Sequence, residues 1–386
     1  MSDPISFYSH QSIDASDEQA VLEVLRSDML TQGPKVEEFE RAIADYLGAK
    51  HVMAVSSGTA ALHLALLAHG VGSGDKVVVP SLTFAATANA ALYCGATPIF
   101  SDVCEDKLSA CDSCIENADM DSGTTANMAI AMDFAGYPDM RIPRHKLSWL
   151  PWITDAAHSF GAEYGWWDGR RPQTPEWSPP DGTRMRVGAQ FTTCFSFHPL
   201  KSITTGEGGA VVTDDGALSE RVRRLRNHGR WADGGQQVDL GFNYRMSDIN
   251  AALGISQLKR IDSFIAKRRA LSLLYVDALA PLIGDGRIKL PTIDYQRSAC
   301  HLFPVLVQGG KRDAVKRKMQ AAGIGVQVHY DPIVPLQPYY RERFGYREGM
   351  WPVAEAAAKS LLSLPLHPGL RESDVQRVVE VFRESL

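Results

Sequence analysis

The 386-residue sequence lacks a block of basic residues, and its formal net charge at pH 7 is −5. Nucleic acids and anionic membranes attract proteins mainly through clustered Lys and Arg, so we expect neither as a partner. A membrane-spanning run is also lacking. The longest uncharged stretch, residues 77–101, contains Pro80, Asn89 and Gly95 and fits strand, helix and strand better than a membrane helix.

Cysteine is scarce, and its spacing gives little support for a metal site. Cys111 and Cys114 form one C-x-x-C pair with no second pair nearby, so zinc is only weakly indicated and we expect no metal. The first residues lack the charged-then-apolar pattern of a signal peptide, which favours a cytoplasmic location with reduced, scattered thiols. The six cysteines are Cys94, Cys104, Cys111, Cys114, Cys194 and Cys300.

Signatures of dinucleotide and nucleoside-triphosphate sites are absent, because the chain has neither G-x-G-x-x-G nor a Gly-Lys-Ser/Thr loop. One anion site is nevertheless indicated. A predicted strand at 52–55 is followed by Ser-Ser-Gly-Thr at 56–59 and an apolar helix at 60–69. Such a helix start directs backbone N–H groups at an anion, and one phosphate fits it better than two or three. A helix N-cap without a ligand is the alternative reading.

Strands and helices alternate along the first part of the chain. Apolar runs at 52–55, 77–79, 97–103, 128–134 and 152–155 are separated by helical patterns or turns, which predicts an α/β fold with a mostly parallel sheet. In such a sheet the site lies at the carboxyl ends of the strands.

We expect a large domain over residues 1–265 and a smaller α+β domain over residues 266–386. The large domain is predicted to begin with amphipathic helices at 16–30 and 36–47. The small domain is predicted to contain helices at 266–279, 313–322 and 373–386 and a strand at 326–330.

One lysine stands in the most distinctive stretch of the chain, residues 194–214. Phe-Ser-Phe at 195–197 and Ala-Val-Val at 210–212 have strand composition, and the turn between them is rich in Gly, Thr and Pro. Burial of Lys201 in this turn would lower its pKa and make the neutral amine available as a nucleophile. The alternative is an ordinary surface lysine on a hairpin.

Asp155 ends a predicted strand, at the edge of the sheet where the site is expected. Such an acid either caps the next turn or holds a cation or a protonated ring nitrogen, and His158 follows three residues later. Lys201, Asp155 and the helix start at 58–59 are together the parts needed to hold pyridoxal phosphate. The amine bonds the cofactor, the acid keeps the pyridine nitrogen protonated, and the helix start binds the phosphate.

Six segments, none distinctive alone, form a recognisable set, and through it nearly the whole chain resembles the DegT/DnrJ/EryC1/StrS family of pyridoxal-phosphate sugar aminotransferases. Residues 91–96, 195–209 and 327–330 are most similar to the C4 aminotransferases of pseudaminic acid biosynthesis. The 4-amino-4-deoxy-arabinose aminotransferases of lipid A modification come second. The six segments are 30–34 (Leu-Thr-Gln-Gly-Pro), 57–62 (Ser-Gly-Thr-Ala-Ala-Leu), 83–89 (Thr-Phe-Ala-Ala-Thr-Ala-Asn), 155–158 (Asp-Ala-Ala-His), 195–209 and 243–248 (Asn-Tyr-Arg-Met-Ser-Asp).

The resemblance implies the type I fold of pyridoxal-phosphate-dependent transferases, like that of aspartate aminotransferase, and a homodimer with shared active sites. It also implies a role for each matching residue. Lys201 is the Schiff-base lysine and proton shuttle, Asp155 pairs with the pyridine nitrogen, and His158 lies near the ring hydroxyl. The remaining implied residues are Phe84 on the ring face, Gly58, Thr59 and Ser196 at the phosphate, Asn243 and Arg245 from the other subunit, and His329 and Tyr330 near the sugar.

The implied activity moves an amino group from glutamate to C4 of a UDP-linked 4-keto-6-deoxy sugar, UDP-2-acetamido-2,6-dideoxy-4-hexulose, with pyridoxamine phosphate as the intermediate cofactor form. Alternatives are an arabinose-type aminotransferase, a dehydratase of the same fold, an amino-acid aminotransferase and a non-catalytic regulator. The pair Lys201 and Asp155 argues against the regulator, and Lys201 against the dehydratases, which carry His there. Two stretches depart from the family: residues 165–190 are long where relatives have a short hairpin, and residues 102–122 are rich in Cys.

Overall fold

The computed structural model describes residues 5–121, 125–138, 150–164, 185–189, 191–231 and 235–386. A seven-stranded sheet in the order β1-β9-β8-β5-β4-β2-β3 forms the centre of this part of the chain. β9 runs antiparallel to both its neighbours and the other pairs are parallel, so the predicted mostly parallel sheet is confirmed. The strands are β1 (His51–Val55), β2 (Lys76–Pro80), β3 (Thr97–Ser101), β4 (Met128–Met132), β5 (Trp152–Asp155), β8 (Thr193–Ser196) and β9 (Gly209–Thr213).

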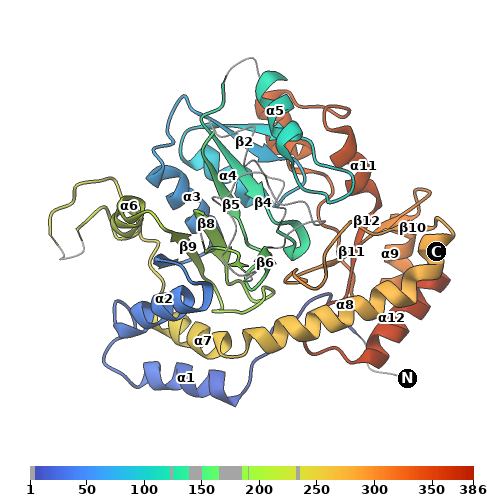
Figure 1. Ribbon diagram of the computed structural model, residues 1–386, viewed down its shortest axis with the longest axis horizontal. Coiled ribbons are helices and arrows are strands. Elements are labelled where there is room, and N and C mark those ends of the chain that lie inside the picture. Colours follow the sequence, from blue (N-terminus) through green and yellow to red (C-terminus); the bar gives the residue numbers. More distant parts are fainter. Residues whose placement is uncertain (1–4, 122–124, 139–149, 165–184, 190, 232–234) are drawn as a thin grey trace.

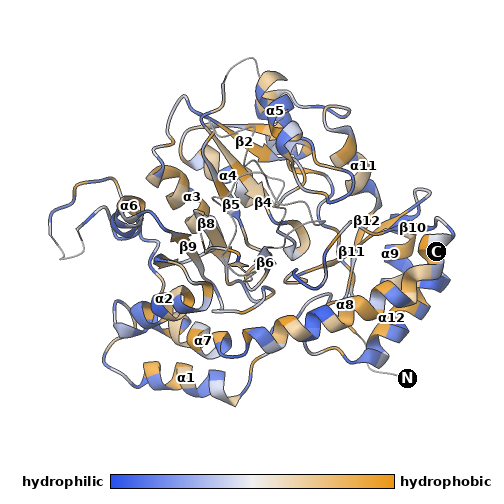
Figure 2. Cartoon of the chain, in the orientation of Figure 1, coloured by the Kyte–Doolittle hydropathy of each residue, from blue (hydrophilic) through white to orange (hydrophobic). Residues whose placement is uncertain are grey.

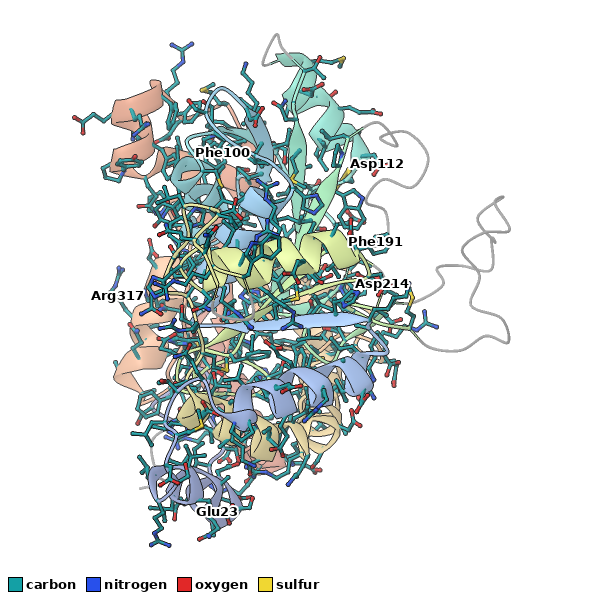
Figure 3. The ribbon with its side chains drawn as sticks, turned by 90° about the vertical axis from the view of Figure 1, so that its left-hand side faces the viewer. Glu23, Phe100, Asp112, Phe191, Asp214 and Arg317 are labelled. Atoms are coloured by element: carbon teal, nitrogen blue, oxygen red, sulfur yellow. A yellow bond between two sulfur atoms is a disulfide. The ribbon has the colours of Figure 1, made fainter. Side chains whose placement is uncertain are left out.

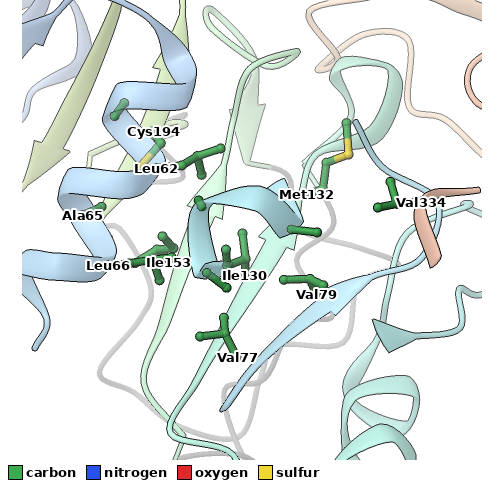
Figure 4. Packing of buried hydrophobic residues seen from close by; sticks show 14 of the residues in the cluster. Leu62, Ala65, Leu66, Val77, Val79, Ile130, Met132, Ile153, Cys194 and Val334 are labelled. Carbon is green, nitrogen blue, oxygen red and sulfur yellow. The ribbon is translucent and has the colours of Figure 1, made fainter. Parts of the chain in front are cut away.

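Helices cover both faces of this sheet, because its strands are apolar on both sides (Figure 1). In β2, Val77 and Val79 pack with α3, whereas Val78 points to the opposite face and packs near α5. Figure 4 shows Leu62 of α3 close to Cys194 of β8. The helices of this part are α1 (Ala15–Leu25), α2 (Pro34–Leu47), α3 (Gly58–Ala68), α4 (Ala85–Tyr93), α5 (Asp112–Asp121), α6 (Gly216–Arg226), α7 (Asp248–Leu258) and α8 (Ile261–Gly284).

A second sheet, antiparallel and in the order β10-β11-β12, packs against α8, α9 and α12 around its own apolar core. This agrees with the predicted smaller α+β unit. The division at residue 265 stays a prediction, because α8 runs through that point and extends the helix expected at 266–279 at both ends. The remaining elements are β6 (Glu163–Tyr164), β7 (Met185–Arg186), β10 (Ile288–Lys289), β11 (Phe303–Val307), β12 (Leu361–Leu364), α9 (Arg312–Ala321), α10 (Pro338–Phe344), α11 (Pro352–Ser360) and α12 (Glu372–Ser385).

The first predicted helix is too long, because α1 ends at Leu25 and not at residue 30. The hydroxyl of Ser27 donates a hydrogen bond to the carbonyl of Val24 at 2.8 Å, and such a side-chain bond competes with continuation of the helix. Leu25 is also 51% exposed, although the sequence pattern assigns it to the buried face.

The predicted strand at 326–330 is also wrong, since this segment is irregular. Its pairing with β12 is limited to one residue, Gln327, which exchanges two backbone hydrogen bonds with Ser363. Just before it, the N–H of Gly325 donates to the carbonyl of Ile5. Contacts with two different partners therefore prevent a continuous ladder, despite the β-branched composition.

The expectation of reduced thiols is wrong for Cys104 and Cys111, and the expectation of scattered thiols is wrong for these two and Cys114. Cys104 and Cys111 are joined in a disulfide, and the sulfur of Cys114 lies 3.8 Å from that of Cys104 and 3.4 Å from that of Cys111. The loop after β3 turns back on itself and brings Cys104 to the start of α5. The contact between these cysteines depends on how the loop folds, so the spacing of the cysteines in the sequence could not predict it.

Hydropathy follows the layers: apolar residues fill the central strands, and the outer helices have one polar and one apolar face (Figure 2). Among the described helices, none is long and apolar enough to span a membrane. Most of the predicted surface loop at 165–190 lies outside the described residues.

Candidate active site

Lys201 lies in the turn of an antiparallel hairpin formed by β8 and β9, so the strand–turn–strand prediction is confirmed. Backbone hydrogen bonds close this turn. The N–H of Phe197 donates to the carbonyl of Gly208, and the carbonyl of Phe197 accepts from the N–H of Thr205. The N–H of Lys201 donates to the carbonyl of His198. The lysine is thereby fixed at one end of the central sheet.

The surroundings of Lys201 favour the neutral amine. Its side chain is largely buried, and burial lowers its pKa to about 8, an effect that the carboxylate of Asp155 partly opposes. At pH 7 about a tenth of such amines are neutral, compared with about one in 3,000 for an unperturbed lysine. The structure thus agrees with the interpretation of Lys201 as a buried lysine and not with the alternative of a surface lysine on a hairpin.

Asp155 is the last residue of β5, at the carboxyl edge predicted for the site, and is 3% exposed. Its carboxylate accepts hydrogen bonds from the hydroxyl of Thr87 at 2.7 Å and from the N–H of Ala157 at 3.2 Å. Burial raises its pKa, whereas these two bonds and Lys201 act in the opposite direction. Thr87 was not among the predicted residues, because it reaches Asp155 from α4, 68 positions away in sequence.

Three buried histidines surround the lysine. The rings of His158 and His301 lie 4.3 Å apart, and His329 bonds the hydroxyl of Ser363 through Nδ1 at 2.9 Å. Burial is the main cause that lowers the pKa of each of these histidines, and it lowers the pKa of His329 to about 3. The three rings are therefore neutral. The Nδ1 atoms of His158 and His301 find no hydrogen-bond partner among the described residues. Because buried polar atoms without partners are rare and both histidines line a cavity, these two nitrogens are available to a ligand.

The residues predicted to bind the phosphate lie where the start of α3 meets the end of β8. Ser57 caps α3 by accepting from the N–H of Ala60, so the N–H groups of Gly58 and Thr59 are left outside the helix bonding pattern. Ser196 lies directly opposite. A Cβ at position 58 would come within 2.8 Å of the Cβ of Ser196, so only glycine fits between the two elements.

A cavity of about 500 Å³ joins these groups. Phe84, at the N-cap of α4, is 58% exposed and lies 6.0 Å, centroid to centroid, from Tyr330 at the cavity wall. The predicted residues in the lining are Gly58, Thr59, Phe84, Asp155, His158, Ser196, Lys201, His329 and Tyr330. Lining residues that the sequence did not single out for the site include Tyr8, Met132, Cys194, Glu207, His301 and Gln327.

Asn243 and Arg245 do not line this cavity. Asn243 is exposed in the turn before α7, and its backbone bridges Asn227. Arg245 donates a hydrogen bond to the side chain of Asn227 at 2.6 Å. Neither residue therefore contributes to the cavity of its own chain, although the backbone of Arg245 pairs with Val55, three residues before Gly58.

A buried lysine, an acid at a strand end and a helix start for one phosphate define the class of pyridoxal-phosphate enzymes. Comparison with known proteins gives the family: residues 11–383 match the DegT/DnrJ/EryC1/StrS aminotransferase family, and the chain belongs to it. The sequence-based assignment is thereby confirmed.

Two curated relatives match almost end to end. The chain is 36% identical to the UDP-4-amino-4,6-dideoxy-N-acetyl-beta-L-altrosamine transaminase of Campylobacter jejuni subsp. jejuni serotype O:23/36 (strain 81-176) over 386 residues, covering 97% of this chain and 96% of that protein. It is 34% identical to the spore coat polysaccharide biosynthesis protein SpsC of Bacillus subtilis (strain 168) over 398 residues, covering 98% and 96%.

Solved structures confirm the predicted fold and cofactor. Helicobacter pylori PseC, an aminotransferase in pseudaminic acid biosynthesis, superposes with a TM-score of 0.82 at 30% identity, with 99% of each chain covered. The pyridoxamine-phosphate form of the putative sugar aminotransferase Spr1654 from Streptococcus pneumoniae gives a TM-score of 0.85 at 27% identity, covering 99% and 98%. The protein is a pyridoxal-phosphate-dependent aminotransferase of the type I fold.

Proposed function

We propose that this aminotransferase moves an amino group from glutamate to C4 of UDP-2-acetamido-2,6-dideoxy-4-hexulose. The observation that carries the chemistry is the cavity in which Lys201 and Asp155 lie together. The sugar is supported by the end-to-end similarity to the C. jejuni transaminase, whose name specifies a UDP-linked 4-amino-4,6-dideoxy sugar.

The described residues fit the cofactor at both ends of the cavity. At one end, the close packing of Gly58 against Ser196 brings the N–H groups at the start of α3 beside the Ser196 hydroxyl, and together these donors would hold a phosphate. At the other end, the carboxylate of Asp155 would pair with the pyridine nitrogen, and the unpartnered Nδ1 of His158 would be available to the ring hydroxyl. Phe84 would cover one face of the ring.

Bound pyridoxal phosphate supplies an electron sink for the carbon from which a proton is removed. Asp155 holds a proton on the pyridine nitrogen, and Thr87 and the N–H of Ala157 keep its carboxylate in position. The pKa of Lys201 near 8 allows this amine to remove a proton from the donor amino acid and to return one to C4 of the sugar. Because Lys201 is fixed on a hairpin, it delivers that proton from one side only.

The wall opposite the sheet is where we place the sugar. His329 and Tyr330 line the cavity there, together with Gln327 of the same segment and Tyr8 from the start of the chain. The neutral His329 offers one ring nitrogen beyond its bond to Ser363. Such polar groups distinguish sugars by their hydroxyl and acetamido substituents.

We further propose a homodimer in which Asn243 and Arg245 serve the active site of the other subunit. Their absence from the cavity of their own chain supports this arrangement. So do exposed apolar side chains near the same turn, since Leu240 is 83% and Trp231 42% exposed. In a two-fold dimer each subunit would lend this turn to its partner.

The function is tested with purified protein charged as the pyridoxamine form. This form is offered a panel of UDP-linked 4-keto sugars with and without the 2-acetamido group and the 6-hydroxyl, and loss of the amine form is followed by absorbance. We expect the fastest single turnover with the 2-acetamido-6-deoxy sugar and a product aminated at C4 by NMR. Glutamate should then restore the amine form faster than other amino acids.

Other outcomes would identify the competing functions. Preference for a UDP-4-keto pentose would assign the arabinose-type reaction. Amination at C3 would exclude both the proposed C4 amination and the arabinose-type reaction. Turnover with free amino and keto acids alone would indicate an amino-acid aminotransferase. Loss of the sugar's oxygen without amination would indicate a dehydratase.

A further inference from the structure

The sulfur atoms of Cys104, Cys111 and Cys114 all lie within 4.8 Å of one another. All three residues are half-buried, so the cluster is reachable from solvent. A tetrahedral zinc ion with Zn–S bonds of about 2.3 Å separates its sulfur ligands by about 3.8 Å. The Cys104–Cys114 distance is 3.8 Å and the Cys111–Cys114 distance is 3.4 Å, both close to that value. The third pair, Cys104 and Cys111, is joined in the disulfide and must be reduced and separate before all three sulfurs fit that geometry.

Local structure holds these side chains together from two directions. Cys104 lies in a loop closed by two backbone hydrogen bonds, from its N–H to Ser109 and from Leu108 to its carbonyl. Cys111 precedes α5, and its carbonyl accepts from Ile115 in the first helical turn. Cys114 lies in that same turn. Helix N-termini favour thiolates, which are the form that binds metals.

We propose that Cys104, Cys111 and Cys114 of the reduced protein bind one zinc-class divalent cation as three thiolates, with water at the fourth position. A dithiol reductant first gives two electrons and two protons to the Cys104–Cys111 disulfide and forms two thiols. Metal binding then releases the thiol protons to solvent. The structure shows the oxidised pair, and the proposal concerns the reduced state, which a cytoplasmic location would maintain.

The position of the cluster indicates a structural rather than a catalytic metal. Asp102, two residues before Cys104, accepts the N–H groups of Val353 and Ala354 at the start of α11. The carbonyl of Asp106 accepts from the N–H of Thr292. Figure 3 labels Asp112, the first residue of α5, on the part of the molecule that also carries Phe100 of β3. A metal here would stabilise the loop between β3 and α5, which contacts α11 and Thr292 of the C-terminal part.

Cobalt titration tests the site, because Co²⁺ bound to thiolates gives a charge-transfer band and intense tetrahedral ligand-field bands. Full-length protein is reduced with a phosphine, freed of metal and titrated anaerobically. We expect one equivalent of Co²⁺ with both bands, and displacement by one equivalent of Zn²⁺. Binding without the charge-transfer band, as histidines would give, overturns the proposal, and so does no binding.

Matched variants locate the ligands. Cys104→Ser, Cys111→Ser and Cys114→Ser should each weaken Co²⁺ binding at least as much as loss of an outer-shell partner, about 10–100-fold. Cys94→Ser, a half-buried cysteine outside the cluster, should bind as wild type. Zinc should raise the melting temperature of the wild type but not of Cys114→Ser. Retained cofactor absorbance shows that each variant is folded, and equal Co²⁺ affinity in wild type and Cys114→Ser refutes the assignment.

Discussion

Replacement of Gly58 by alanine should weaken cofactor binding, because the new methyl group would collide with Ser196 and push apart the two elements that form the proposed phosphate site. Its Cβ would lie 2.8 Å from the Cβ and 3.3 Å from the Cα and Oγ of Ser196. The φ of Gly58 lies outside the left-handed region, so alanine is tolerated by the backbone and the cost arises from space alone.

The expected magnitude is set by the cost of overpacking, about 1–3 kcal/mol. To relieve the overlap, the first turn of α3 and the end of β8 must separate, which moves the N–H groups away from the Ser196 hydroxyl. If the whole cost falls on the bound state, the dissociation constant of pyridoxal phosphate rises about 5- to 150-fold.

The assay is a titration of cofactor-free protein with pyridoxal phosphate, followed by absorbance. Gly72→Ala is the matched control, because a Cβ there meets nothing within 4 Å. The loss caused by Gly58→Ala should be smaller in a Ser196→Gly background, where the opposing Cβ is gone. Affinity within twofold of wild type for Gly58→Ala, or an equal loss for Gly72→Ala, would refute the proposed phosphate site.

Three further predictions concern the roles of Lys201, Asp155 and Asn243. Asp155→Asn should keep the cofactor bound but slow each half-reaction at least about 100-fold in single turnovers, and near-normal rates would exclude its role. In cofactor-free protein, covalent attachment of pyridoxal phosphate to Lys201 should accelerate as pH rises, with a midpoint near 8, because only the neutral amine attacks. Asp155→Asn should lower that midpoint, since the carboxylate raises the lysine pKa, and a wild-type midpoint near 10.5 would contradict burial. Finally, Lys201→Ala and Asn243→Glu homodimers should be nearly inactive, since a glutamate at 243 would repel the phosphate. Randomly mixed dimers should recover about a quarter of wild-type activity, because half are mixed and one site in each is intact. No recovery after verified subunit exchange would show that each site is built within one chain.

Features encoded locally could be predicted from the sequence. The hairpin around Lys201, the cap formed by Ser57 and the strand that ends at Asp155 depend on residues close together in the chain. The family resemblance added Phe84, which no local pattern marks.

Features that depend on distant contacts could not be predicted. Thr87 and His301 join Asp155 and His158 only after the sheet has formed; Thr87 stands in the matched segment 83–89, but nothing there marks it as the partner of Asp155, and His301 stands in no matched segment. The segment 326–330 has strand composition, but its hydrogen-bond partners come from two different parts of the chain. Strand propensity depends on such context.

The pairing of β5 with β8 places Asp155 directly beside Cys194, seven residues before the lysine. Asp155 ends one of these paired strands and Lys201 lies in the turn that follows the other, whereas Gln327 and His329 come from an irregular segment outside the sheet. If the proposed sugar site is correct, new substrates can be accommodated by changes in the irregular segment while the sheet keeps the reacting groups in position. A family built in this way can diversify its sugars without evolving its chemistry anew.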